Sequence, residues 1–170
     1  MVTNQERMYT NARFAVAVHI LTFVAMRGPT SQSITSSMIA ESVDTHPVVI
    51  RRILGVLRQA QLVVSQPGTG GGWTLAKPAQ MITLLQIYRA VKETPLFTVH
   101  RHPPNAGCPI GQNMVDVLNI YFAQAESAVE KQLECVTLDH IVNAVAARMP
   151  AVTPPPRTLA KQSKNARRAV

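Results

Sequence analysis

The feature that most constrains the fold of this chain is a short interruption, residues 44–47, between two amphipathic helical patterns. A short helix is predicted over residues 36–43, with polar residues 31–35 before it as caps, and a second helix over residues 48–60. Pro47 suits the first turn of the second helix, where its missing N–H costs no hydrogen bond. Two helices joined this tightly form a helix-turn-helix pattern.

The second helix has two chemically different sides. One side is apolar, with Val48, Ile50, Ile53, Leu54 and Leu57, and the other is largely polar and basic, with Arg51, Arg52, Arg58 and Gln59. A solvated face would account for the arginines as well. Nevertheless, a helix-turn-helix with a basic outer face is typical of proteins that bind DNA.

A β-hairpin is predicted directly after this helix. Residues 62–65 and 73–76 read as its strands, and the glycine-rich residues 66–72 as the turn between them. In this place the hairpin is the wing of a winged helix, where glycine permits positive φ and close approach to a DNA minor groove. A nucleotide-phosphate loop is not predicted, because the glycines open a strand and not a helix, and no Gly-Lys-Ser/Thr is present.

Two further helices complete the N-terminal part. A helix capped by Thr10 or Asn11 is expected to run to about Arg27, and its apolar residues cover most of its circumference, so it should be buried on several sides. His19 within it is expected to be a hydrogen-bonded core residue. The other helix is expected over residues 84–92, with Thr83 as its cap.

The C-terminal half is dominated by one long amphipathic helix. It follows a proline-rich loop, residues 94–111, and over residues 113–136 it would span roughly 36 Å at ~1.5 Å per residue. Pairing with a second copy is the simplest cover for so long an apolar stripe, and packing back on its own domain is the alternative. The predicted dimer-interface residues are Met114, Val117, Leu118, Tyr121, Ala125, Ala128 and Val129.

The fold class expected is mainly α with a small β-hairpin wing, that is, a winged helix-turn-helix domain plus a long dimerisation helix. Residues 1–93 form the DNA-binding domain and residues 94–111 a sensor or linker loop. Residues 112–149 hold the dimerisation helix and a short terminal helix over residues 139–148, and residues 150–170 are a disordered basic tail.

The charge of the chain is unevenly distributed. The formal net charge is +8, with ten Lys and Arg against four acids in residues 1–103, two against five in residues 104–150, and five against none after that. A basic front suggests a polyanionic partner, although charge for solubility alone is the alternative. No apolar run reaches the roughly 18 residues of a membrane span, and residues 14–26 lack the features of a signal peptide, so a cytoplasmic protein is expected.

The candidate DNA contacts are assigned from where each residue lies in the predicted helices and in the wing. Residues near the start of the second helix usually face a groove, so His46, Val48, Val49 and Arg52 are candidates for reading bases. Arg51 is assigned to a phosphate, as are Ser36, Ser37 and Arg13 at predicted helix starts. The remaining candidates are Arg58 on the second helix and Gln66, Thr69, Gly70 and Gly71 in the wing.

The proline-rich loop contains His100, His102 and Cys108, which are a possible sensor. These residues could hold a soft metal, although their spacing matches no strong metal motif and no metal is predicted. Cys108 just before a helix could be a thiol switch with a lowered pKa, or a small residue that packs at the helix start. Cys135 is expected to be an interface hydrophobe. A Cys-His enzyme is not predicted, because no acid partner or oxyanion motif is evident.

Four segments together resemble a known family: residues 11–19 (NARFAVAVH), 51–54 (RRIL), 70–78 (GGGWTLAKP) and 82–85 (ITLL). They are similar to the Rrf2 family of bacterial winged-helix transcription regulators, which includes the iron–sulfur regulators IscR and NsrR, over roughly residues 8–149. The resemblance implies a homodimer on a partly palindromic promoter site, with the second helix in a major groove and each wing in a minor groove. It also implies a bacterial, cytoplasmic source.

The chain departs from this family in the cluster-binding loop and in the wing. Cluster-binding members carry three cysteines before the dimer helix, whereas this loop has Cys108 alone. A cluster normally needs about four ligands, so we expect no iron–sulfur cluster and no other cofactor. Gln66 stands where some members have an arginine suited to a narrow minor groove. We expect a DNA-binding regulator, more specifically a repressor, with an RNA-binding or ribosome-associated winged-helix protein as the alternative.

Overall fold

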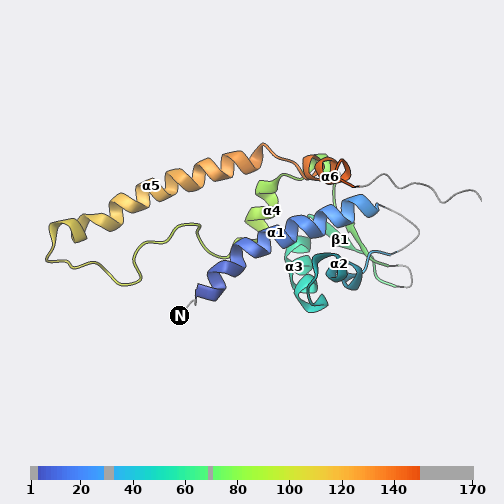
Figure 1. Ribbon diagram of the computed structural model, residues 1–170, viewed down its shortest axis with the longest axis horizontal. Helices are drawn as coiled ribbons and strands as arrows, with labels where there is room; N and C mark the ends of the chain where they lie inside the picture. The colour runs from blue at the N-terminus through green and yellow to red at the C-terminus, as the bar shows by residue number, and fades with distance from the viewer. Residues whose placement is uncertain (1–3, 29–32, 69–70, 150–170) are drawn as a thin grey trace, which may run out of the picture.

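The computed structural model describes residues 4–28, 33–68 and 71–149 (Figure 1). The elements, in chain order, are α1 (Asn4–Arg27), α2 (Ser36–Val43), α3 (Pro47–Gln59), β1 (Val63–Ser65), β2 (Trp73–Leu75), the 3₁₀ helix η1 (Ala79–Met81), α4 (Leu84–Val91), α5 (Pro109–Glu134) and α6 (Leu138–Ala146). The expected fold class is confirmed, since the chain is mainly helical with one antiparallel hairpin. The predicted basic tail, residues 150–170, lies outside the described residues.

A compact head carries one long projecting helix. The head consists of α1–α4, the hairpin and α6, with α1 at its centre, where it packs against α2, α3, α4, α6 and β2. Figure 1 shows α2 and α3 on one side of α1, and α5 and α6 on the other, with α5 extending well beyond the head. The expectation that α1 is enclosed from several sides is therefore confirmed.

The core of the head is built from aliphatic side chains. Its largest fully buried residues are Ile20, Leu21, Ile39, Ile50, Ile53, Leu54, Leu57, Leu62, Val63, Ile82, Ile87 and Leu138. Each such side chain stabilises the fold by about 1.5–3 kcal/mol relative to an exposed one. The apolar face of α3 is thus held firmly inward, and its basic face is left outward.

The chain returns to the head after α5. The Leu84 N–H donates to the Val136 carbonyl at 2.8 Å, and the Leu138 N–H donates to the Ile82 carbonyl at 2.7 Å. These two bonds form an isolated antiparallel bridge between Thr83 and Thr137. The short terminal helix therefore begins inside the core of the head, with Leu138 fully buried.

Most predicted helix boundaries are confirmed because polar caps mark them. Thr35, Thr83 and Thr137 each accept a backbone N–H at the start of α2, α4 and α6, and the latter two form capping boxes with Gln86 and His140. The hairpin pairs Val63 with Leu75 and Ser65 with Trp73, close to the predicted strands. The short helix η1 was not predicted.

Three expectations were wrong. First, α1 begins at Asn4 and not at Thr10 or Asn11, because the preceding residues Gln5 to Met8 are good helix formers that extend it. Second, α5 spans Pro109–Glu134 and not residues 113–136, because Cys108 is its N-cap and proline is favoured at the first position. Third, His19 is exposed and not in the core, although its Nε2 is hydrogen-bonded to Ser42 Oγ at 3.0 Å.

No helix among the described residues combines the length and the apolar composition that a membrane span requires.

Candidate nucleic-acid interface

The outer face of α3 is the most exposed basic surface of the helix-turn-helix. Asp44 ends α2 in a left-handed conformation, with φ 57°, and the Thr45 N–H donates to the Ala40 carbonyl, which closes the turn. Ile50, Ile53, Leu54 and Leu57 point into the core, so Arg51, Arg52 and Arg58 are all left exposed. The structure therefore brings these three arginines to one helix, on its solvent side.

The first turn of α3 has an unusual apolar exposure. Val48 is 53% exposed and Val49 is also exposed, two and three residues after the cap His46. A valine methyl gains no favourable contact from water, but it can pack against the methyl group of thymine in a major groove. The first turn of α3 thus combines apolar surface with hydrogen-bonding groups.

The start of α2 presents backbone N–H groups of the kind that favour an anion. Thr35 accepts from the Met38 N–H at 3.3 Å, while Ser36 and Ser37 occupy the first turn, Ser37 exposed and Ser36 half-buried. The first backbone N–H groups of a helix have no partner within the helix and favour a phosphate. The predicted positions of Ser36 and Ser37 at a helix start are correct.

The wing is attached to the segment that leads into α2. Gln66 N–H donates to the Gly72 carbonyl at 2.9 Å, and Trp73 N–H donates to the Ile34 carbonyl at 3.0 Å. A Cβ at position 72 would lie 2.7 Å from the Ile34 nitrogen, and one at position 71 would overlap the Gln66 carbonyl. The close approach that requires glycine at 71 and 72 is thus to the backbone of the protein itself.

Other wing residues fit the expected turn. Gly68 has φ +99°, a left-handed value that favours glycine, and Gln66 is exposed. Trp73 is half-buried and packs against the core, as expected for a residue that anchors the hairpin. Thr69 and Gly70 were also predicted as DNA contacts, and they lie outside the described residues.

Arg13 differs from the outward-facing arginines of α3 because it is largely buried. It is nine residues after the start of α1, so the reasoning that placed it at a helix start was wrong. Its side chain is only 18% exposed and forms an ion pair with Glu93 at the end of α4. Its Nε is buried without a hydrogen-bond partner among the described residues. Burial, and then the charge of Arg52, lower the pKa of Arg13.

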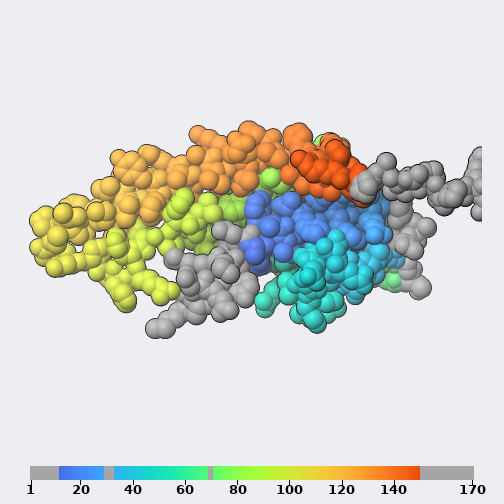
Figure 2. Space-filling model, in the orientation of Figure 1, coloured from blue at the N-terminus to red at the C-terminus, as the bar shows by residue number. Residues whose placement is uncertain are grey.

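The α2–α3–hairpin side of the head is separated from α5. In Figure 2, α2 and α3 protrude on the side of the head away from the long helix. His46, Val48, Val49, Arg51 and Arg52 lie together at the start and middle of α3, and Gln66 lies in the wing. These candidate DNA contacts and α5 therefore lie on opposite sides of the head.

Most of α5 has no cover from the head. None of its side chains is buried, and Tyr121 is 63% exposed. Among the predicted interface residues, Val117, Tyr121, Ala128 and Val129 are exposed, whereas Met114, Leu118 and Ala125 are half-buried. Ile110 and Ile120 are further exposed aliphatic residues on this helix that the prediction did not include.

Cys108 is the N-cap of α5 and is half-buried. The nearby backbone N–H groups of Gly111 and Ile110 favour the thiolate and lower the pKa of Cys108, in the direction predicted for a cysteine at a helix start. His100 and His102 are exposed in the preceding loop. Among the described residues, no three His, Cys, Asp or Glu side chains are gathered where they could share a metal ion.

The cysteine positions do not fit an iron–sulfur cluster. Cys108 and Cys135 flank the two ends of α5, which at ~1.5 Å per residue separates them by on the order of 40 Å. Cys135 is exposed and its thiol donates to the Lys131 carbonyl. Two thiols this far apart cannot ligate one cluster, which normally needs about four ligands.

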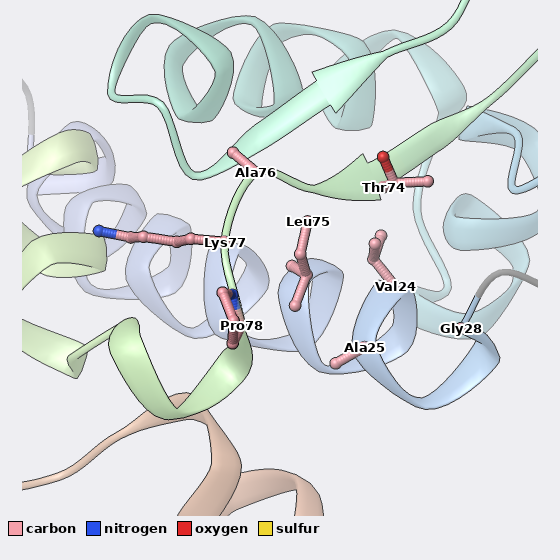
Figure 3. A pocket seen from close by; sticks show the side chains of 8 residues that line it. All are labelled: Val24, Ala25, Gly28, Thr74, Leu75, Ala76, Lys77 and Pro78. Carbon is pink, nitrogen blue, oxygen red and sulfur yellow. The ribbon is translucent and has the colours of Figure 1, made fainter.

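A shallow groove lies between α1 and β2, on the head (Figure 3). Its volume is about 410 Å³ and its lining is mostly aliphatic, including Val24, Ala25 and Leu75. Lys77 is turned away toward α4, where its Nζ donates to Gln86 Oε1 at 3.0 Å. Among the residues that line the groove, none therefore directs a charge into it.

The chain is similar to known transcription regulators. Residues 10–144 match the model of the Rrf2 family, described as iron-dependent transcriptional regulators. It is 40% identical over 134 residues to YwnA of Bacillus subtilis, a predicted HTH-type transcriptional regulator, covering 78% of this chain and 96% of that protein.

Solved structures show the same likeness. A crystal structure of a predicted DNA-binding protein is 34% identical and superimposes with a TM-score of 0.61, covering 77% of this chain and 99% of that one. IscR of T. potens superimposes with the same TM-score of 0.61 at 20% identity, covering 81% and 89% of the two chains. The latter likeness is one of fold.

Proposed function

The chain belongs to the Rrf2 family of DNA-binding transcriptional regulators, and from this premise we propose that it is a homodimeric repressor of a partly palindromic promoter site. It is a regulator and not an enzyme, as its family and relatives indicate. The observation that carries the proposal is the exposed basic face of α3, beside the wing and opposite the uncovered helix α5.

In the proposed complex α3 enters a major groove. Arg51 and Arg58 neutralise phosphates, together with the N-terminus of α2 at Ser36 and Ser37, and these contacts supply most of the affinity. His46, Val48, Val49 and Arg52 at the start of α3 face base edges. Gln66 in the wing approaches the adjacent minor groove.

The proposed dimer buries the exposed side of α5. Val117, Tyr121 and Val129 supply apolar surface that the head leaves uncovered, and a second copy offers the same surface around a two-fold axis. Such a dimer presents two α3 helices to one face of a duplex, about one turn or ~34 Å apart.

The proposed regulator works in the cytoplasm without an iron–sulfur cluster. The separation of Cys108 and Cys135 along α5 supports the absence of a cluster, because two thiols so far apart do not make up the usual set of ligands. Cys108, with its lowered pKa, is then the candidate group for a thiol- or ligand-responsive loop. No feature of the described residues favours the RNA-binding alternative.

The proposal is tested by fluorescence anisotropy with the full chain and the duplex upstream of its own gene. We expect binding to this duplex to be at least ten-fold tighter than to a random duplex at moderate salt. Equal affinity for both would overturn the promoter-site proposal, and tighter binding to structured RNA would favour the alternative. Sedimentation of the free protein as a monomer would overturn the dimer.

A further inference from the structure

The helix α3 differs from its neighbours in the residue that caps it. Thr35, Thr83 and Thr137 cap α2, α4 and α6, each through a short side chain that reaches only the first turn of its own helix. His46 caps α3 instead, and its Nδ1 accepts a hydrogen bond from the Val48 N–H at 3.2 Å. Serine, threonine, asparagine and aspartate are the usual caps, so capping alone does not explain a histidine at this position.

The capping bond determines which ring nitrogen carries the proton. A nitrogen that accepts an N–H is unprotonated, and a neutral imidazole then bears its proton on the other nitrogen, Nε2. Nε2 lies on the far side of the ring from Nδ1, and no hydrogen-bond partner for it exists among residues 4–28, 33–68 and 71–149. His46 is exposed, so it presents one N–H donor to solvent at the very start of α3.

The surroundings of this donor favour a base edge over a phosphate. Val48 and Val49 are exposed beside it, and aliphatic groups match thymine methyls and not charged phosphates. Arg52, one turn further along, is exposed on the same helix. In the major groove every purine presents N7 as an acceptor, which a single N–H donor can recognise.

We propose that His46 is a specificity-determining residue with two roles, capping α3 through Nδ1 and donating Nε2–H to the N7 of a purine in the major groove. The assignment rests on the proposed function, since it requires α3 to be the helix that reads DNA. It adds to that function the identity of one donor, the atom it recognises and the reason for a histidine cap.

The test uses a duplex that the full-length wild-type protein selects from a random pool. His46→Asn keeps a good cap but shortens the side chain and removes the far donor, while Thr83→Asn makes the matched cap exchange on α4, away from DNA. Each purine of the duplex is replaced in turn by its 7-deaza analogue, which lacks N7. In a second series, each phosphate is replaced by a methylphosphonate.

We expect His46→Asn to bind the selected duplex about 3- to 10-fold more weakly than the wild type, the loss typical of one hydrogen bond. Its thermal unfolding and its binding to random duplex should be unchanged, and Thr83→Asn should bind normally. At one purine, the 7-deaza analogue should weaken the wild type by the same factor and leave His46→Asn unaffected.

Three results would overturn the assignment. The first is wild-type affinity in His46→Asn. The second is a methylphosphonate that weakens wild-type binding by the same factor as His46→Asn, while no 7-deaza purine does so. His46 would then contact a phosphate and not a base. The third is an equal loss on selected and random duplexes. A wild-type protein that selects no duplex would instead overturn the proposed function itself, and with it this assignment.

Discussion

Glu126 on α5 accepts a hydrogen bond from Lys92 Nζ at 3.0 Å, and this pair joins the long helix to the end of α4. The other oxygen of the same carboxylate accepts the Leu96 N–H at 2.8 Å and the Phe97 N–H at 3.4 Å. Phe97 in turn stacks on Phe122 with ring centroids 5.2 Å apart. One carboxylate thus sets the path of the loop that leaves α4 and the position of α5 beside it.

Replacing Glu126 by glutamine should make stability less dependent on pH in the acid range. The hydrogen bond from Lys92 is the main cause that lowers the pKa of Glu126 in the folded protein. A carboxyl with a lowered folded pKa stabilises the protein above its unfolded pKa, near 4.5, and loses that contribution as the pH falls through the folded pKa. The unfolding temperature of Glu126→Gln should therefore lie below that of the wild type at pH 7, and the gap should narrow as the pH falls below 4.5.

Asp116→Asn is the matched control for this substitution, because Asp116 is an exposed acid on the same helix. It should follow the wild-type pH profile. A difference between Glu126→Gln and wild type that is the same at pH 3 and pH 7 would contradict the ion-pair interpretation.

Removing the charge of Glu93 should destabilise the head, because Arg13 would be left as a largely buried cation close to Arg52. Glu93 is 60% exposed, so water screens much of the pair, and we expect a loss of about 1 kcal/mol in the free energy of unfolding. Urea denaturation of Glu93→Gln measures it. Arg13→Met combined with Glu93→Gln should recover part of the loss, and exposed Glu41→Gln should be neutral.

The two adjacent arginines of α3 should respond differently to truncation. Arg52→Ala should cost ~1–3 kcal/mol on the selected duplex if the side chain is bidentate to guanine, and much less on random DNA. Arg51→Ala should weaken binding to all duplexes alike and reduce the slope of log affinity against log salt by about 1. Anisotropy titrations over a range of salt measure both quantities. Identical profiles for the two variants would refute the separate roles.

A charge on the open side of α5 should separate the proposed dimer. Tyr121 is 63% exposed in the single chain, so Tyr121→Asp should leave the head folded while placing a carboxylate in the dimer interface. We expect the sedimentation coefficient to fall to that of a monomer and DNA affinity to drop at least ten-fold. The control is Asn119→Glu, an exposed position on another side of the helix. A dimer that persists in Tyr121→Asp would place the interface elsewhere.

The two cysteines should differ in reactivity. Backbone N–H groups of Gly111 and Ile110 lower the pKa of Cys108, so a larger fraction is thiolate at neutral pH. With iodoacetamide at pH 7, the Cys135→Ser protein, which retains Cys108, should be labelled faster than the Cys108→Ser protein. Mass spectrometry follows the rates, and the advantage of Cys108 should shrink as the pH is raised, because a lowered pKa raises the thiolate fraction most near neutral pH. Equal rates at pH 7 would show that Cys108 is no more activated than Cys135.

Sequence patterns identified those parts of the fold that are held by local interactions. Thr35, Thr83 and Thr137 accept N–H groups three residues away, so the starts of α2, α4 and α6 can be predicted from a few consecutive residues. The apolar side of α3 and the glycine-rich turn of the wing are local patterns too. They were sufficient to predict the exposed arginines and the winged-helix order.

The sequence by itself therefore determined the helices, the hairpin and the basic outer face of α3, because propensity, capping and periodicity act over a few residues. Only the tertiary structure decided that Leu138 returns to the core of the head, that Arg13 pairs with Glu93, and that Glu126 binds Lys92. These contacts join residues 34 or more positions apart in the chain. No local pattern specifies such partners, since they meet only after the helices have packed around α1.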